Sequence, residues 1–457
     1  MSSTLISDAE LKARLQEELN AFKQEGIQGW DLYLKQQEIK KWLPTQDAQQ
    51  IRWVERLIWK PKGRSDFRRL QPELVFVKSS YKIKVKNIWG EEVERDVPSN
   101  DPLELHWKIL RKLVSTARDT GGGGMRTLKF LVRDKVSRKY LGVICISSDF
   151  MDLVGREKEI GWDKKQFQRP TGKLFGKLNH IAQGQAIVPT QPFGSAFNGV
   201  KLLALLCLSK EVADKWEEVY GQKLVAVTTT ALWGNAKTYS SYDGLDPYWK
   251  RLKETSGNTP MKFTDDTYQL MKDWLKVRDP EKYVDLFEAK KADGSMLTRD
   301  SKSKSISTVM QKLGIPVKDQ KSNAIRLAYM SLLYKNSAEF LRDEISESEL
   351  EPAFQNTTEE LVHFWRFGIR GDTTRKMTKA DKRKLKEDNT WIVGGYDYTR
   401  NLASSAKART DDLLRRAKDQ QVPALIPTQG PAVEWYESLA QMTWDEAKER
   451  FLKQIAR

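Results

Sequence analysis

The most strongly patterned stretch of the chain is an apolar run over 199–208, followed by a polar segment over 211–221 and a second apolar run over 224–230. The first two segments predict one helix that is mostly apolar at its start and polar at its far end, and Gly221 stands where such a helix would end. The run over 224–230 is short and rich in β-branched residues, which predicts a buried strand. We expect the rest of the chain to be organised around this helix and strand.

Alternating polar and apolar positions lie upstream of this run. Residues 128–132 and 140–147 predict the two strands of a hairpin, and residues 178–189 contain a further strand. Residues 73–89 alternate in the same way and predict two short strands with lysines between their apolar positions. The pattern therefore predicts a sheet.

The remaining patterned segments predict helices. Leu11, Leu15, Leu19 and Phe22 fall four, four and three residues apart, which is the spacing of an amphipathic helix. Residues 236–259 are rich in tyrosine and tryptophan, and we expect an aromatic helix there, after the central strand. Further helices are predicted at 46–59, 103–118, 150–158, 268–277, 281–290, 306–313, 323–334, 400–419 and 433–457.

These elements predict an α+β protein with a central mixed sheet and helices, flanked by basic helical regions at both ends. A chain of 457 residues is expected to form two or three domains. The pattern divides it into a mainly helical region with a small strand pair over 1–120, a core over 121–262, and a basic helical region over 263–457.

The net charge of the chain indicates which kind of partner the protein binds. The formal charge is +16 and the pI about 9.4, which favours a polyanionic partner, most simply DNA. The alternative is a basic surface that only confers solubility. Because the charge is spread along the chain and not gathered in one tail, we prefer the nucleic-acid interpretation.

Two segments are the strongest candidates for phosphate contacts. The segment 59–69 mixes basic and aromatic residues, and 373–386 is a strongly basic run. Each segment could also be a solvated loop or helix face. The candidate nucleic-acid contacts are Lys60, Lys62, Arg64, Arg68, Arg69, Arg375, Lys376, Lys379, Lys382, Arg383, Lys384 and Lys386.

Cysteine, histidine and hydropathy patterns bound the class of protein. Cys145 and Cys207 lie in apolar runs, which indicates buried free thiols and a reducing compartment. His106, His180 and His363 are far apart, so we predict no metal site. The first residues do not resemble a signal peptide, and no apolar run is long enough to cross a bilayer. We therefore expect a cytoplasmic protein with no membrane contact.

The order of hairpin, helix, strand, turn, long helix, strand and aromatic helix resembles the core of the GNAT N-acyltransferases. Gln191, Gly194 and Ala196 match the family's Gln/Arg-x-x-Gly-x-Gly/Ala motif. The resemblance implies that backbone amides there and the following helix N-terminus hold the pyrophosphate of an acyl-CoA such as acetyl-CoA. The chain departs from the motif at Pro192, which removes one amide donor, and its apolar helix begins only near Asn198.

The same resemblance implies a catalytic acid. In this fold a tyrosine of the later helix often protonates the departing thiolate, and Tyr242 stands closest to that place. The alternative is that Tyr242 packs in the core with Tyr248 and Trp249.

A second resemblance covers roughly 128–259. The ordered set of motifs is similar to the DruA-like family, which is named for a component of the Druantia anti-phage system and also occurs in phages and mobile elements. The family's Gly-rich basic end after Thr-x-Gly is replaced here by Asn258-Thr259-Pro260. The resemblance implies a setting of phage–host conflict and DNA, but no reaction. The matching motifs are Leu141-Gly142, Ile160-Gly161-Trp162, 201–205, Trp216 with Tyr220-Gly221, 224–230 and 248–257.

Other catalytic patterns are weaker. Residues 121–124 are four glycines, but no Gly-Lys-Ser/Thr follows and no strand precedes them, which favours a flexible connector over a phosphate-binding loop. Asp243, Asp246 and Glu254 are close in sequence without forming a nuclease signature. His180 is the only histidine of the core, and such a residue is more often structural than catalytic.

Three hypotheses follow. The leading one is a DNA-associated protein of a phage, mobile-element or anti-phage setting, with a GNAT-like, DruA-type core and basic helical flanks, to which protein partners could also bind. The second is an acyl-CoA-dependent N-acyltransferase with Tyr242 as its acid. The third is a structural or ejected protein of a phage particle, which sedimentation as a discrete large assembly would favour.

Overall fold

The structure is a computed structural model that describes residues 6–59, 69–78, 80–86, 92–98, 101–114, 126–163, 172–190, 193, 199–231, 240–255, 258–288, 301–323, 325–367, 392–393 and 396–397. Over these residues the protein is α+β with a mixed sheet, which confirms the predicted class. The basic run 373–386, the glycines at 121–124 and the helices predicted at 400–419 and 433–457 lie outside the described residues.

The chain forms two compact units. Among the described residues, the smaller unit contains 6–34, 258–288, 301–323 and Ile325, and the larger unit contains the others. The smaller unit is therefore built from two separate stretches of sequence. The three-part division at 120 and 262 stays a prediction about domains.

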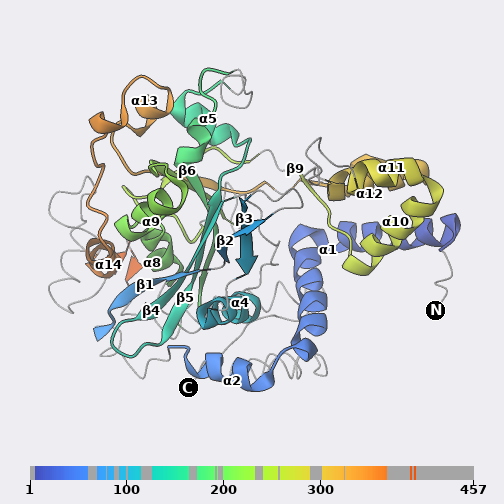
Figure 1. Cartoon of the computed structure of the whole chain (residues 1–457), viewed down its shortest axis with the longest axis horizontal. Helices are drawn as coiled ribbons and strands as arrows, with labels where there is room; N and C mark the ends of the chain where they lie inside the picture. Colours follow the sequence, from blue (N-terminus) through green and yellow to red (C-terminus); the bar gives the residue numbers. More distant parts are fainter. Residues whose placement is uncertain are drawn as a thin grey trace. The chain divides into compact units, whose positions relative to one another are not determined.

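The larger unit is built on a seven-stranded sheet with the order β1-β4-β5-β6-β7-β11-β8 (Figure 1). Every neighbouring pair is antiparallel except β6 and β7, which run parallel. A parallel pair needs a crossover connection, and the helices that follow β6 supply it. The strands are β1 (Pro72–Val77), β4 (Thr127–Asp134), β5 (Tyr140–Ser148), β6 (Ile181–Pro189), β7 (Ala226–Thr230), β8 (Lys250–Arg251) and β11 (Ala328–Leu332).

Helices cover both faces of this sheet. α4 (Pro102–Val114) packs on one face, where Trp107 Nε1 donates to the Ile144 carbonyl at 3.2 Å. The other face carries α8 (Gly199–Leu206), α9 (Lys210–Tyr220) and α14 (Thr358–Phe367). Figure 1 shows these two groups on opposite sides of the strands. Double coverage explains why β5 is buried along almost its whole length and is apolar without alternation.

The smaller elements of the larger unit surround the sheet. The strand pair β2–β3 has full antiparallel register and contains the second of the two strands predicted at 73–89, the first being β1. These elements are α2 (Ala48–Arg56), α5 (Val154–Ile160), α13 (Ser337–Leu341), η1 (Leu43–Thr45), η2 (Lys177–His180), η4 (Glu347–Glu349), β2 (Ser80–Lys86), β3 (Glu92–Pro98), β12 (Ile392–Val393) and β13 (Tyr396–Asp397).

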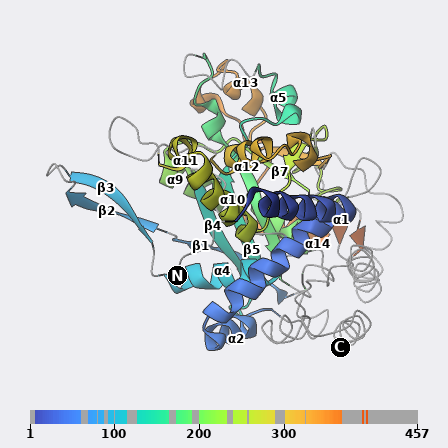
Figure 2. The same cartoon turned by 90° about the vertical axis from the view of Figure 1, so that its right-hand side faces the viewer.

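The smaller unit is mainly helical. Its core joins apolar residues of α1 (Asp8–Trp42) with those of α10 (Asp265–Arg278), α11 (Pro280–Phe287) and α12 (Ser301–Lys312) (Figure 2). Only the residues of α1 up to Leu34 belong to this unit. Glu18 is buried in it and accepts hydrogen bonds from the Thr264 and Thr267 hydroxyls at 2.6 and 2.5 Å. The other elements are η3 (Val317–Gln320) and the antiparallel pair β9 (Asn258–Pro260) and β10 (Lys321–Asn323).

The predicted central helix is two helices. Ser209 interrupts it, with extended backbone angles and a side chain that accepts a hydrogen bond from the Val212 amide at 3.3 Å. This is an N-cap, so the polar segment begins a new helix and does not continue α8. Gly221 ends α9 with φ at 67°, which confirms the predicted C-cap.

Two predicted helices are wrong. Residues 323–334 contain strand β11, and residues 240–255 form turns and the short strand β8. β11 is buried on both faces, and all of its residues but Ser331 are apolar or aromatic. Such a run does not distinguish a strand from a helix. In the second segment Gly244 has a positive φ and Pro247 lacks an amide hydrogen, both of which oppose a helix.

Candidate functional site

The predicted nucleic-acid contacts fall mostly outside the described part of the chain. Within it lies Arg69, which is exposed. Outside it lie Lys60, Lys62, Arg64, Arg68, Arg375, Lys376, Lys379, Lys382, Arg383, Lys384 and Lys386, together with the predicted cofactor residues Gln191, Gly194 and Ala196.

The residues that flank the basic segment 60–68 are nevertheless fixed. On its N-terminal side, the Trp59 amide donates to the Tyr140 carbonyl at 2.9 Å. On its C-terminal side, the Gln71 amide donates to Asp134 Oδ1 at 2.8 Å, and the Lys135 amide donates to the Gln71 carbonyl at 2.7 Å. Trp59 and Gln71, which flank the segment, are therefore held where the β4–β5 turn meets its strands.

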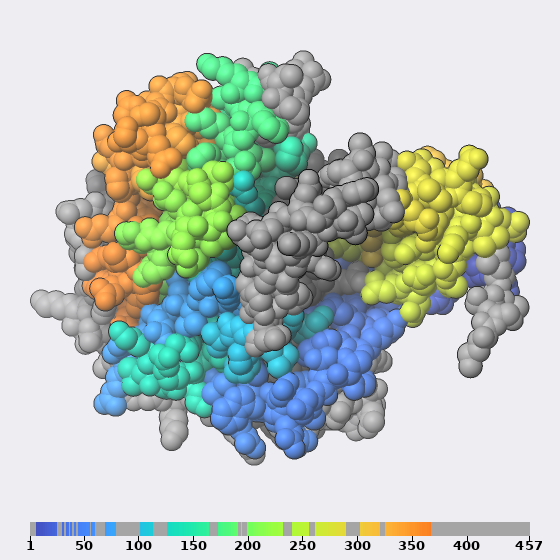
Figure 3. All heavy atoms as spheres, in the orientation of Figure 1, coloured from blue at the N-terminus to red at the C-terminus, as the bar shows by residue number. Residues whose placement is uncertain are grey.

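Helix α2 lies beside this turn. Lys139 Nζ donates to the Arg56 carbonyl at the end of α2, and Figure 3 shows α2 and the turn along the lower edge of the molecule. Trp53 is 57% exposed although it is a large aromatic residue, and Arg52 and Arg56 are exposed beside it. We call the described part of this region the hairpin-end surface, made of Arg52, Trp53, Arg56, Arg69, Lys135, Arg138 and Lys139.

A hollow of about 610 Å³ opens between α2 and α4 at this surface. His106 at its wall shares a hydrogen bond of 2.7 Å with Tyr140 Oη. Burial lowers the pKa of its imidazole, and the nearby Asp101 carboxylate opposes this shift. Asp47 brings one carboxylate to the rim and accepts a hydrogen bond from the Gln49 amide at 2.8 Å. The lining residues are Asp47, Gln49, Gln50, Arg52, Trp53, Arg56, Pro102, Leu105 and His106.

This arrangement suits a nucleic acid. Guanidinium groups form bidentate hydrogen bonds with phosphate oxygens, and an exposed indole offers a face on which a base or sugar packs. The sequence contained a usable signal, because Ile51 and Val54 are buried while Arg52, Trp53 and Arg56 occupy the outward positions of the same helix. An exposed tryptophan between two arginines on an amphipathic helix is that signal.

Tyr242, the predicted acid, lies in the core of the larger unit. It is 9% exposed, with ring centroids 5.3 Å from Tyr329 and 6.2 Å from Trp249. Burial raises the pKa of its phenol, as does the nearby Cys207 thiol, while contact with the Thr229 hydroxyl opposes the rise. These are the surroundings of a packed core residue, and catalysis by Tyr242 stays a prediction.

A polar cluster adjoins Tyr242. The Asp243 carboxylate accepts hydrogen bonds from Tyr329 Oη at 2.8 Å and from the Ser240 amide at 2.7 Å, and Ser240 Oγ donates to Tyr329 Oη at 2.7 Å. Burial raises the pKa of the Tyr329 phenol, and Asp243 adds to the rise. The buried Lys201 of α8 donates to the Asp243 carbonyl. The cluster anchors residues 240–243 to β11 and to α8.

Near this cluster the backbone pairing of β6 with β7 ends, although Thr229 Oγ1 still donates to the Gly184 carbonyl at 2.9 Å. β6 and β7 pair from Ile181 with Ala226 to Gln183 with Thr228, although β6 continues to Pro189 and β7 to Thr230. The two parallel strands therefore separate toward their carboxyl ends. In open α/β sheets, ligands bind outside the carboxyl ends of parallel strands, at the point where the order of the strands reverses.

The described residues contain no group of three or more His, Cys, Asp or Glu side chains placed to hold a metal ion. Among the helices of the described ranges, none is long and apolar enough to cross a membrane.

Comparison with known proteins identifies the family. Residues 62–343 match the family described as DruA, Druantia protein DruA. Because this match covers more than half of the chain, the protein belongs to the DruA family, as the sequence motifs predict. That assignment supports an anti-phage setting.

A curated relative, the Druantia protein DruA of Escherichia coli (strain UMEA 4076-1), is 27% identical over 168 residues. The match covers 34% of this chain and 39% of the relative. The chain thus matches well under half of that relative's length. No solved structure matches the chain, and the GNAT-like character of the core stays a prediction.

Proposed function

We propose that this protein binds DNA as part of anti-phage defence, and that the hairpin-end surface together with the basic segments predicted from the sequence makes the contact. The observation that carries the proposal is the exposed Trp53 between Arg52 and Arg56, next to the turn that holds the residues flanking the basic segment 60–68. The net charge of +16 and the family assignment support it. In this account the protein acts with other proteins of a Druantia-type system.

Charge supplies the binding energy in this account. Each phosphate that a basic side chain neutralises releases counterions, so affinity falls as salt rises. An interface of about six to ten phosphate contacts loses about 10³–10⁵ in affinity between about 50 and 200 mM salt. The hairpin-end surface contributes only some of these contacts, because the segments 60–68 and 373–386 add theirs.

The test is the double variant Arg52→Glu/Arg56→Glu in the full chain. We expect weaker binding to duplex DNA and a salt slope that is smaller by about two, measured by fluorescence anisotropy. The matched control is Lys210→Glu/Lys335→Glu, which changes the net charge equally at two lysines whose side chains are 62% and 66% exposed. Equal affinity and slope in the two variants would remove the hairpin-end surface from the proposal.

Defence is tested with the same pair of variants. In cells that carry the complete system, the Arg52→Glu/Arg56→Glu variant should lose protection against phage in plaque assays, and the control variant should keep it. Full protection by the first variant would separate DNA binding at this surface from defence.

An acyl-CoA-dependent N-acyltransferase is the second candidate. The separation of β6 from β7 favours it, because it leaves strand ends open next to α8 and close to Tyr242. A ligand at about 100 times its Kd stabilises the folded state by about 2.7 kcal/mol. Acetyl-CoA should therefore raise the melting temperature clearly, and an unchanged melting temperature at saturating concentrations would rule against this candidate.

A further inference from the structure

Helix α12 of the smaller unit has one buried face and one polar face. Ile306, Val309 and Met310 are buried in the core of the unit, so the opposite side of the helix faces away from this core. That side carries Lys304 and Gln311, both exposed, with the half-buried Ser303, Ser307 and Thr308. α12 contains no acidic residue, and residues 301–323 carry five lysines and a single acidic residue.

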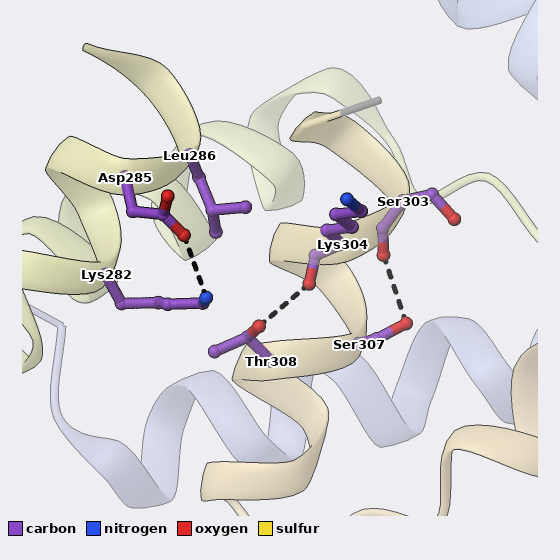
Figure 4. A pocket seen from close by; sticks show the side chains of 7 residues that line it. All are labelled: Lys282, Asp285, Leu286, Ser303, Lys304, Ser307 and Thr308. Carbon is purple, nitrogen blue, oxygen red and sulfur yellow. Dashed lines mark hydrogen bonds and ion pairs between the residues drawn. The ribbon is translucent and has the colours of Figure 1, made fainter. Parts of the chain in front are cut away.

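A pocket of about 310 Å³ lies between this polar face and α11. Figure 4 shows Lys282, Asp285 and Leu286 reaching it from α11, and Ser303, Lys304, Ser307 and Thr308 from α12. The helix backbone orders two of the three hydroxyl-bearing residues: Ser307 Oγ donates to the Ser303 carbonyl at 3.0 Å, and Thr308 Oγ1 donates to the Lys304 carbonyl at 2.9 Å. A hydroxyl group can both donate and accept hydrogen bonds, which suits contacts with a polar ligand.

The lysines around the pocket differ in their partners. Lys302 pairs with Asp265 at 3.8 Å, Lys312 pairs with Asp279 at 2.9 Å, and Lys282 pairs with Asp285 at 3.0 Å. Lys304 has no ion pair within the described part of the chain. The uncompensated positive charge of the pocket therefore lies at the middle of the polar face of α12.

We propose that α12 is a DNA-recognition helix, which enters the major groove of a duplex with Lys304 on a phosphate and its hydroxyl and amide side chains toward phosphates and base edges. The proposal rests on the proposed function and adds a second contact, in the other unit. A helix of 12 residues is about 18 Å long and fits a groove about 12 Å wide. Lysine, serine, threonine and glutamine are the residues that such helices use for these contacts.

The packing of the unit supports this role. α10 and α11 pack against α12 and against each other, and α11 also borders one side of the polar face at the pocket. Lys304 and Gln311 of that face remain exposed. Third helices of such bundles read the major groove in helix-turn-helix proteins.

The test compares full-length variants in binding to duplex and single-stranded DNA over a salt series. Lys304→Glu should weaken duplex binding about tenfold and lower the salt slope by about one, whereas Lys304→Arg should bind as the parent does. Lys335→Glu, at a lysine of the larger unit that is 66% exposed, is the matched control. Melting temperatures verify that each variant is folded.

The outcomes separate the two proposals. Parent-like duplex binding by Lys304→Glu, with weakened binding by Arg52→Glu/Arg56→Glu, overturns the role of α12 and leaves the proposed function standing. Weakened binding by Lys304→Glu alone supports α12 and removes the hairpin-end surface. A loss that appears with single-stranded DNA but not with duplex overturns the major-groove assignment, and a parent protein that binds no DNA overturns both proposals.

Discussion

At the scale of single residues, Arg156 forms a buried network of ion pairs that links α5 to the sheet of the larger unit. Its side chain has no exposed surface; its guanidinium pairs with Asp149 at 2.7 Å and with Glu157, and donates to the Phe150 carbonyl at 2.6 Å. Asp149 also accepts a hydrogen bond from Thr228 Oγ1 at 2.6 Å. The network therefore ties α5 to strand β7 across the buried side of the sheet.

Removing one partner of this network should be costly. Asp149→Ala leaves the buried Arg156 charge without one of its two counterions, and we expect a loss of about 3–5 kcal/mol in the free energy of unfolding. Urea unfolding measures it. Lys335→Ala, which breaks an exposed pair with Glu351, should cost no more than about 1 kcal/mol. Similar losses in the two variants would mean that the buried network does not hold α5 to β7.

His180 predicts how stability depends on pH. Its Nδ1–H donates to the Lys223 carbonyl at 2.8 Å and its ring meets Phe340 edge-on at 4.9 Å, and burial lowers its pKa below the ordinary value of 6.5. The unfolded chain then takes up a proton at a higher pH than the folded one. Stability from this residue is complete above pH 6.5 and is lost as pH falls from there to the folded pKa.

The measurement is the free energy of unfolding between pH 7.5 and pH 5. The parent should lose stability over the lower part of this range faster than His180→Gln, which has no titrating ring. Parallel curves for the two proteins would contradict this assignment.

At the scale of elements, the junction between α8 and α9 depends on one hydroxyl. Ser209 is fully buried and caps α9, and the Asn356 carbonyl accepts a hydrogen bond from the Lys210 amide at 2.8 Å. Ser209→Ala should destabilise the protein by about 0.5–2 kcal/mol, because the first turn of α9 loses its side-chain acceptor. Chemical denaturation measures this, and an unchanged midpoint would mean that the backbone contacts alone end α8 and start α9.

The same elements show what the sequence could predict. The hairpin β4–β5, helix α4, helix α10 and strand β7 were predictable because the residue pattern of each is clear. The end of α9 was predictable from its cap, Gly221. Strand β11 was not, because Leu327, Tyr329 and Leu333 enter one core while Ala328 and Met330 enter another, which erases the alternation. Local pattern does not record which faces the rest of the chain will cover.

The sequence suggested which type of ligand each candidate site could bind, but not which residues lie together in it. The net charge favoured a nucleic-acid partner. The sequence did not show that Arg52, Trp53 and Arg56 of α2 lie beside the β4–β5 turn, because the helix and the turn are far apart in sequence. The alternative for Tyr242, packing in the core, agrees with its contact with Trp249, but its enclosure and the Asp243–Tyr329 contact depend on β11. Catalysis by Tyr242 stays a prediction.

At the scale of the whole molecule, basic charge is present in both units. The larger unit presents the hairpin-end surface and the smaller unit presents α12, each with lysine or arginine beside groups that contact phosphates or bases. A chain with a net charge of +16 that belongs to the DruA family is accordingly expected to bind DNA through more than one surface. The contacts should act together, since tethered sites raise each other's effective concentration.

The affinity of the full-length protein for duplex DNA over a salt series tests the central claim most directly. We expect tight binding at about 50 mM salt and a logarithmic plot that falls linearly with a slope of several units, about 0.9 for each phosphate contact. Acetyl-CoA should leave this binding unchanged. Absence of binding at about 50 mM salt, or binding whose affinity does not change with salt, would contradict the account.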